Sequence, residues 1–354
     1  MQRAPVISQN NLIHVSDSWQ QQLRNTLTTA DQLLHRLDLT ARDVGFSARA
    51  SAEFSLKVPL AFVNRMRPGE PRDPLLLQVL ASAQELQQTP GYDGDPVGET
   101  GASNPQRGII HKYHGRALLI VSGGCAVNCR YCFRRHFPYS DNQNSREQWR
   151  EALLYVRADS SIEEVILSGG DPLVATDGQL AELVAEIASI EHVRRLRIHT
   201  RLPIVIPDRI TDTLLDAICH PQLQTVMVVH CNHANEVDQS VRIAMSALKG
   251  RDITLLNQSV LLAGVNDDAE TLIALSEKLF AAGALPYYLH LLDKVQGAAH
   301  FDVSEQRASL LMGEMASRLP GYLVPKLARE VAGAESKIVV AARYCDTPAV
   351  NHGH

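Results

Sequence analysis

The chain has 354 residues and a formal net charge of −5 at pH 7, and 45% of its residues are apolar and 21% charged. This composition is typical of a globular protein with a full hydrophobic core, and the negative charge argues against neutralisation of nucleic-acid phosphates. No apolar run reaches the roughly 18 residues of a membrane span, and residues 1–15 lack the apolar segment of a signal peptide, so we expect a cytoplasmic protein that binds neither membranes nor nucleic acid.

The first 107 residues are expected to form an N-terminal helical region followed by a linker. Leucines recur at helical spacing between residues 23 and 37, after the capping candidates Asp17 and Ser18. Residues 73–88 have the same pattern. Residues 89–107 are dense in Gly, Pro, Asp and Ser, which is typical of a loop.

From residue 108 on, short apolar runs alternate with amphipathic stretches. The runs predicted to be strands are 117–121, 165–167, 196–198, 226–229, 253–262 and 285–292. The stretches predicted to be helices are 146–156, 179–190, 210–218, 237–248, 269–281 and 304–319. Strand–helix units of about 30 residues indicate parallel strands joined by right-handed crossovers. A doubly wound sheet and a barrel both fit, and in either fold the site lies at the C-terminal strand ends.

Polar and reactive side chains follow the predicted strands. Three cysteines come after the first strand and Ser168-Gly169-Gly170-Asp171 after the second. The further residues at or near strand ends are His199 and Arg201 (third), His230 (fourth), Gln258 (fifth) and Asp293 (sixth). Because parallel strands end at one edge of a sheet, this placement predicts a single site.

The three clustered cysteines are Cys125, Cys129 and Cys132, spaced C-x3-C-x2-C. Clustered thiols in a reducing compartment more often bind metal or react than form disulfides. A structural zinc ion needs four ligands, and His136 is the obvious local fourth ligand. An iron–sulfur cubane held by three thiolates instead leaves one iron open to another ligand. Inert or redox-active cysteines are the remaining alternative.

The spacing of these cysteines, with Tyr131 before the last of them, resembles the signature of the radical S-adenosylmethionine (SAM) superfamily. That resemblance implies a [4Fe-4S] cluster whose open iron binds SAM and a partial (β/α)6 barrel, here over residues 108–320 after the N-terminal helical extension. Residues 168–171 resemble the glycine-rich SAM motif, in which Ser168, Gly169 and Gly170 approach the ligand and Asp171 accepts from its ammonium group. His230 is expected to line the same pocket.

Five stretches are similar to lysine 2,3-aminomutases, and the similarity extends from about residue 73 to Lys337. The stretches are His111–Cys125, Cys129–Phe137, Val165–Leu173, Asn257–Asp267 and Leu285–Phe301. The resemblance implies pyridoxal phosphate (PLP) as a second cofactor, with Lys337, in a C-terminal segment 321–354, as the lysine that binds it covalently. Without the resemblance, Lys337 would be interpreted as a solvated lysine, because only Gly333 remains of the family's glycine-rich run.

The resemblance also assigns the other contacts of cofactor and substrate. Lys112 and Arg116 match positions that bind the PLP phosphate, although family members tend to have arginine at the first of these, and Gln258 matches a residue near the cofactor. Arg134 matches the arginine that binds the substrate carboxylate. Asp293 and Glu330 match acids that hold the ε-ammonium, and Glu330 is one methylene longer than the usual Asp. Two anions there favour a substrate with a cationic side chain, such as L-lysine, which the enzymes of this family convert to β-lysine.

The chain stops seventeen residues after Lys337, whereas lysine-degrading members continue into a zinc-binding extension, so we expect no structural zinc. This short form resembles the EpmB-type bacterial enzymes that make β-lysine for elongation factor P. The partners so implied are an electron donor such as flavodoxin, a ligase acting on elongation factor P, and further copies of the chain in a homo-oligomer. The alternatives are a catabolic or osmolyte-forming lysine or arginine aminomutase, a radical SAM enzyme without PLP, and a zinc-binding protein that is not an enzyme.

Overall fold

A run of parallel strands, β2 to β8, forms the centre of the fold, and each is hydrogen-bonded to the next strand along the chain. The computed structural model describes residues 18–101, 103–139 and 146–344. The parallel strands are β2 (Arg116–Ser122), β3 (Glu164–Gly169), β4 (Arg195–Thr200), β5 (Gln224–His230), β6 (Thr254–Val260), β7 (Leu285–His290) and β8 (Lys326–Arg329). A strand order that never reverses is that of a barrel and not of a doubly wound sheet.

Two short antiparallel strands form the ends of this sheet in the described part of the chain. They are β1 (Ile109–Tyr113), which pairs with β2, and β9 (Ile338–Val339), which pairs with β8. The sheet order does not join β1 to β9. The barrel is therefore partial, as the sequence predicts.

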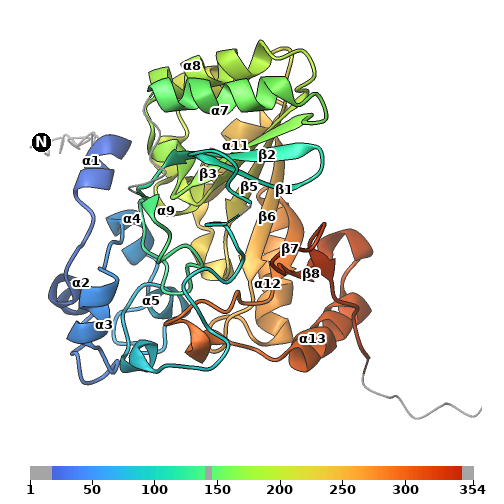
Figure 1. The fold of residues 1–354 in the computed structure, drawn as a ribbon. Helices are drawn as coiled ribbons and strands as arrows, with labels where there is room; N and C mark the ends of the chain where they lie inside the picture. Colours follow the sequence, from blue (N-terminus) through green and yellow to red (C-terminus); the bar gives the residue numbers. More distant parts are fainter. Residues whose placement is uncertain (1–17, 102, 140–145, 345–354) are drawn as a thin grey trace, which may run out of the picture.

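Helices follow the strands and cover the outer face of the sheet; Figure 1 shows α7 and α8 side by side there. They are α7 (Arg146–Ala158), α8 (Asp177–Ala188), the short α9 (Leu202–Val205), α10 (Asp212–Ile218), α11 (Gln239–Lys249), α12 (Ala269–Ala281) and α13 (Glu305–Arg318). Side-chain caps start five of them, because Thr176, Thr211, Asp238, Asp268 and Ser304 each accept a backbone N–H of the first turn. The six predicted strand–helix pairs are confirmed, with bounds within two residues of those observed.

Strand β8 was not predicted. It has four residues, of which Leu327 and Ala328 are buried while Lys326 and Arg329 are exposed. Two buried residues do not make an apolar run that stands out from a loop. The strand nevertheless matters for the site, because it directly precedes Glu330.

The N-terminal residues form short helices, grouped to one side of the barrel in Figure 1. They are α1 (Trp19–Arg24), α2 (Ala30–Arg36), α3 (Ala48–Glu53), α4 (Leu60–Val63) and α5 (Pro74–Leu77). The continuous helix predicted from residue 23 to 37 is wrong, because Leu27 pairs with Val58 and Thr29 caps a new helix. The helix predicted over 73–88 is also interrupted. It ends at Leu77, and a 3-10 turn follows at Ala83–Leu86.

The largest apolar core lies between the sheet, its covering helices and the N-terminal helices. Trp19 and Leu33 belong to the same buried cluster as Leu167 and Leu183. On β4, Leu196 and Ile198 point into this core, so the alternating residues Arg197 and His199 face the barrel interior. In this register the interior positions of the neighbouring strands include His230, Gln258 and His290. The inward face of the sheet therefore carries polar side chains among apolar ones such as Val228 and Leu256.

The predicted loop over residues 89–107 is free of helix and strand in its described part, which omits Ala102. It is fixed to the barrel, because Asp93 N–H donates to Lys294 O (3.1 Å) and Gln296 N–H donates to Asp93 O (2.8 Å). The predicted boundaries at 107 and 320 stay predictions, and residues 1–17 and 345–354 of the predicted regions lie outside the described residues. In the described part, no helix has the length and apolar character needed to span a membrane.

Gly169→Ala is expected to destabilise the fold. Gly169 has φ +117°, and a Cβ there would collide with Ser122 O. The strain and the collision together should lower the free energy of unfolding by about 2 to 4 kcal/mol, measured by urea denaturation. The matched control is Gly178→Ala in α8, where a Cβ meets nothing within 4 Å. This variant should have a free energy of unfolding about 0.5 to 1 kcal/mol higher than the wild type. Equal stability of the two variants would contradict this account.

Candidate active site

The cysteine loop follows β2 and is held by the N-terminal helices. Asn128 N–H donates to Lys57 O and Arg130 N–H to Gln78 O, both at 2.9 Å. Arg130 is fully buried and its Nε lies 2.9 Å from Oε1 of Glu85. Two arginine side chains thus share one buried carboxylate, because Arg135 also pairs with Glu85 at 3.0 Å.

The three thiols of this loop are free. Cys125, Cys129 and Cys132 form no disulfide, and each is half-buried. Burial and the neighbouring thiols raise the pKa of Cys132 to about 11 and shift that of Cys125 upward as well, so binding of a metal must displace protons. No group of three or more His, Cys, Asp or Glu in the described residues is arranged to hold a single metal ion. A cubane places its thiolates on different irons and does not need them to converge on one point.

The Ser168–Asp171 segment docks against the start of the cysteine loop. Gly170 N–H donates to Ser122 O (2.7 Å) and Asp171 N–H donates to Gly124 O (2.9 Å). A Cβ on Gly169 or Gly170 would collide with the backbone of this loop. Both glycines are therefore needed for contact between two parts of the chain, whatever they do for a ligand.

The carboxylate of Asp171 is occupied by the chain's own donors. Its Oδ1 accepts from Leu173 N–H (3.0 Å) and Thr200 Oγ1–H (2.7 Å), and its Oδ2 accepts from Arg201 N–H (2.8 Å) and Leu202 N–H (3.1 Å). Four hydrogen bonds use the acceptor capacity of a carboxylate. The geometry thus favours a positioning role for Asp171, and an ammonium group would have to displace one of these donors.

Arg201, after β4, connects the cysteine loop to the barrel. Its Nη1 lies 2.8 Å from both Cys129 Sγ and Tyr131 Oη, and its Nη2 lies 3.0 Å from Glu236 Oε2. Tyr131 Oη also lies 2.9 Å from His230 Nε2, and the two rings stack. The structure thus brings His230 next to the cysteine loop, where the sequence predicts it.

Arg134 is buried next to the same strand ends. Its Nε and Nη2 donate to the two carboxylate oxygens of Glu99, at 2.6 and 2.9 Å. Its Nη1 donates to Ser168 Oγ and Gly169 O, both at 3.0 Å. One N–H of Nη2 is left, so a bidentate contact with a substrate carboxylate requires Glu99 to move.

Glu330 joins the two ends of the open barrel. Its Oε1 accepts from Lys112 Nζ of β1 at 2.8 Å, and its Oε2 accepts from Lys337 Nζ next to β9 at 2.5 Å. Lys112 Nζ also lies 3.6 Å from Glu99. The two lysines lower the pKa of Glu330 to about 2 despite its burial. Three predicted residues therefore meet in one ion cluster.

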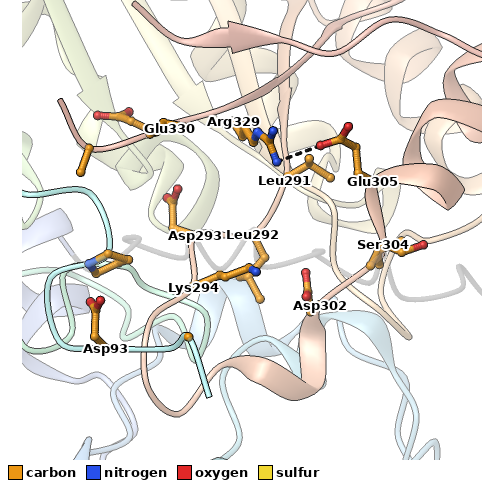
Figure 2. A pocket seen from close by; sticks show the side chains of 15 residues that line it. Asp93, Leu291, Leu292, Asp293, Lys294, Asp302, Ser304, Glu305, Arg329 and Glu330 are labelled. Carbon is orange, nitrogen blue, oxygen red and sulfur yellow. Dashed lines mark ion pairs between the residues drawn. The ribbon is translucent and has the colours of Figure 1, made fainter. Parts of the chain in front are cut away.

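A cavity of about 460 Å³ opens beside this cluster, at the ends of β7 and β8. Figure 2 shows Glu330, Asp293 and Asp93 along one side of it and the ion pair of Arg329 with Glu305 on the other. Five carboxylates line it, those of Asp93, Asp293, Asp302, Glu305 and Glu330, against the cations of Lys294 and Arg329. Burial and the charge of Glu330 raise the pKa of Asp293 to about 7. The cavity is suited to a cationic group.

The two other predicted PLP contacts come from β2 and β6. Arg116 begins β2, and its guanidinium lies 4.8 Å from the ring centre of Tyr113. Gln258 pairs with His230 in the sheet register and faces the barrel interior. Also inside the barrel, His199 Nε2 is buried and has no hydrogen-bond partner among the described residues. Burial and the charges of Arg197 and Lys337 lower the pKa of its imidazole.

Two important contacts were not predicted from the sequence. Glu99 lies in the loop that was interpreted as a linker, and no motif marks it. Arg201 was noted as a strand-end residue without a role, and its partner Glu236 lies 35 residues further on. Only the fold brings such residues together.

Comparison with known proteins agrees with this geometry. Residues 119–275 match the Radical SAM superfamily. The protein is therefore a radical SAM enzyme, the class that uses a [4Fe-4S] cluster and SAM. In structure, a radical SAM methyltransferase from Sphaerobacter thermophilus aligns with a TM-score of 0.44 at 18% identity, covering 62% of this chain and 68% of that chain.

Two relatives define the family more closely. The chain is 52% identical over 322 residues to the L-lysine 2,3-aminomutase of Escherichia coli (strain K12), covering 91% of this chain and 94% of that protein. It is 51% identical over 336 residues to that of Haemophilus influenzae, covering 95% and 99%. The chain belongs to the lysine 2,3-aminomutase family and is an isomerase. The alternative of a zinc-binding protein that is not an enzyme is wrong.

Glu330→Gln is expected to destabilise the protein most at neutral pH. A folded-state pKa of about 2, below the ordinary 4.5, contributes about 3 kcal/mol. That stability is present above pH 4.5 and is lost as the pH falls toward 2. Urea denaturation should therefore show a loss of about 3 kcal/mol at pH 7 and a smaller loss at pH 4. The control, Glu335→Gln, removes an exposed carboxylate of the same segment and should change little. A loss that does not depend on pH would contradict the ion-cluster account.

Proposed function

We propose that this protein converts L-lysine to β-lysine by a radical 2,3-amino shift that uses SAM, the cluster and PLP. The observation that carries the proposal is the position of Lys337. Its Nζ lies 2.5 Å from Oε2 of Glu330, which lines the acid-rich cavity, at the end of the barrel to which the cysteine loop also belongs. A covalent cofactor on Lys337 and a cationic substrate would then lie in the same barrel as the radical source.

PLP fits the residues on this side of the barrel. Nε2 of His199 is a buried polar atom on the inward face of β4, without a hydrogen-bond partner in the part of the chain that the structure describes. Lys112 and Arg116 supply positive charge for a phosphate, and Gln258 supplies an amide on the inward face of β6. When bound, PLP delocalises the radical that forms during the amino shift.

The chain's own residues bind and orient the substrate in this proposal. Asp293 holds the ε-ammonium group, because its carboxyl group lines the cavity and makes no side-chain hydrogen bond within the described residues. Glu330 adds a second anion when Lys337 is engaged by the cofactor. Arg134 holds the α-carboxylate after Glu99 is displaced from it. The walls of the barrel exclude water from the radical.

The cysteine loop supplies the radical source. Cys125, Cys129 and Cys132 hold the cluster, and the segment Ser168–Asp171 with His230 borders the place for SAM. The cluster and SAM held there would supply the radical that takes a hydrogen atom from the substrate.

The cellular role proposed here is supply of β-lysine for elongation factor P, with a flavodoxin-type electron donor and a homo-oligomeric assembly. The support is the similarity to the EpmB-type enzymes. The test offers the purified product to a ligase that acts on elongation factor P and measures the mass of the modified protein. Failure of the ligase to accept the product would favour a catabolic or osmolyte-forming role.

Anaerobically reconstituted protein with lysine, SAM, PLP and dithionite should form β-lysine, measured by chromatography of the derivatised amino acids. Lys337→Ala should lose this activity and the visible absorption of lysine-bound PLP, while it keeps its iron and sulfide. The matched control is Lys326→Ala, which removes an exposed lysine of β8 and should retain both. Formation of β-lysine by Lys337→Ala at the wild-type rate would refute the role of this residue.

The KM for lysine should depend on the ionisation of Asp293. With a pKa of about 7, its carboxyl group is neutral at low pH and ionised at high pH. Because the cationic substrate binds the ionised form, KM should be about tenfold higher at pH 6 than at pH 8. Asp293→Asn should raise KM at pH 8 and abolish this dependence. An unchanged pH profile in Asp293→Asn would assign the titration to another group.

A further inference from the structure

Arg201 makes a charged contact with one cysteine of the cluster loop. Its Nη1 lies 2.8 Å from Cys129 Sγ, and the residue is 6% exposed. Its Nη2 lies 2.7 Å from Gln78 Oε1 and 3.0 Å from Glu236 Oε2. Gln78 Nε2 in turn donates to Glu236 Oε1 at 3.1 Å, so the two acceptors hold each other and the guanidinium in one place.

The charge of Arg201 is permanent. Arginine stays protonated in proteins, and the guanidinium lies against the ring of Phe62, 5.3 Å from its centre. A buried charge acts more strongly than an exposed one, because the surroundings screen it less. Arg201 therefore places a fixed positive charge and an N–H donor on a sulfur that ligates the cluster in a radical SAM enzyme.

Two other buried arginines of this fold are neutralised without any contact to a sulfur atom, so burial of a guanidinium does not by itself explain the contact of Arg201 with Cys129. Arg130 pairs with Glu85, and Arg209 pairs with Asp177 at 2.7 Å and donates to Leu173 O. The guanidinium groups of these two arginines thus donate to carboxylate oxygens and to backbone carbonyl oxygens. Arg201 instead donates to the sulfur of Cys129 as well as to oxygens of Glu236, Gln78 and Tyr131.

We propose that Arg201 sets the reduction potential of the cluster through its charged hydrogen bond to Cys129. Reduction adds one negative charge to the cluster, and hydrogen bonds to its sulfurs and nearby positive charge both favour the reduced state. Glu236 opposes this effect, because it neutralises part of the charge on Arg201. Arg201 and Glu236 together thus adjust how readily a reductant reduces the cluster before SAM is cleaved. This inference rests on the radical SAM cluster and not on the proposed lysine chemistry.

The test is an anaerobic redox titration of the reconstituted holoenzyme without lysine or PLP. The reduced cluster is followed by electron paramagnetic resonance, with dithionite as reductant. Arg201→Gln should shift the midpoint potential to more negative values. At a fixed potential the ratio of reduced to oxidised cluster should fall at least tenfold, which is 59 mV for a one-electron couple. Arg201→Lys keeps the charge and should shift the potential less.

Two further variants separate this role from a structural one. Arg209→Gln removes a fully buried arginine that contacts no cysteine and should lower stability with little change in potential. Glu236→Gln keeps an oxygen for the N–H groups that now donate to Oε1 but leaves Arg201 without its counter-charge. It should shift the potential to more positive values, opposite to Arg201→Gln.

Several outcomes would overturn the proposal. One is an unchanged or more positive potential in iron-loaded Arg201→Gln, and another is a shift in Arg209→Gln as large as that in Arg201→Gln. If Arg201→Gln does not take up iron, Glu236→Gln decides, and an unchanged or more negative potential there refutes the role of the pair. Absence of β-lysine formation would not affect these results, because no substrate is present.

Discussion

The fully bonded carboxylate of Asp171 is the interaction on which the geometry of the site depends. The backbone N–H of Asp171 donates to the cysteine loop after β2 and so joins that loop to the end of β3. The two carboxylate oxygens of Asp171 accept from Thr200, Arg201 and Leu202 at the end of β4. Three adjacent strand ends are thereby fixed relative to one another. Arg201 can reach Cys129 because this junction positions its backbone.

A second constraint follows from the incomplete closure of the barrel. Sheet hydrogen bonds do not join β1 to β9, and the cluster of Lys112, Glu330 and Lys337 bridges these two ends instead. Ion pairs can exchange partners, whereas a closed ladder of backbone hydrogen bonds cannot do so without unfolding. The gap that leaves the barrel open is therefore also where the charged groups gather that we propose for cofactor and substrate.

The fold was predictable from the sequence where local pattern decides the structure. The spacing of the apolar residues was enough to predict six strand–helix pairs, because those strands are buried and their helices are amphipathic. It failed at β8, with two buried residues, and at Leu27, where pairing with Val58 interrupts the helix. The cysteine motif is local and was recognisable. The ion pair of Glu99 with Arg134 and the contact of Arg201 with Cys129 were not recognisable, because residues far apart in sequence meet only in the folded chain.

Because β9 is short, the segment that carries Lys337 opens more easily than the cysteine loop. Lys337 directly precedes a strand of two exposed residues that pairs on one side with β8, whereas the cysteine loop is clamped by buried arginines and by the Asp171 junction. Segments with few buried contacts open at low free energy. If Lys337 holds a cofactor as we propose, its segment can therefore move aside and return while the cysteine loop stays in place. The proposed exchange of one amine for another would then take place on the easily opened segment and the proposed radical source would sit on the rigid one.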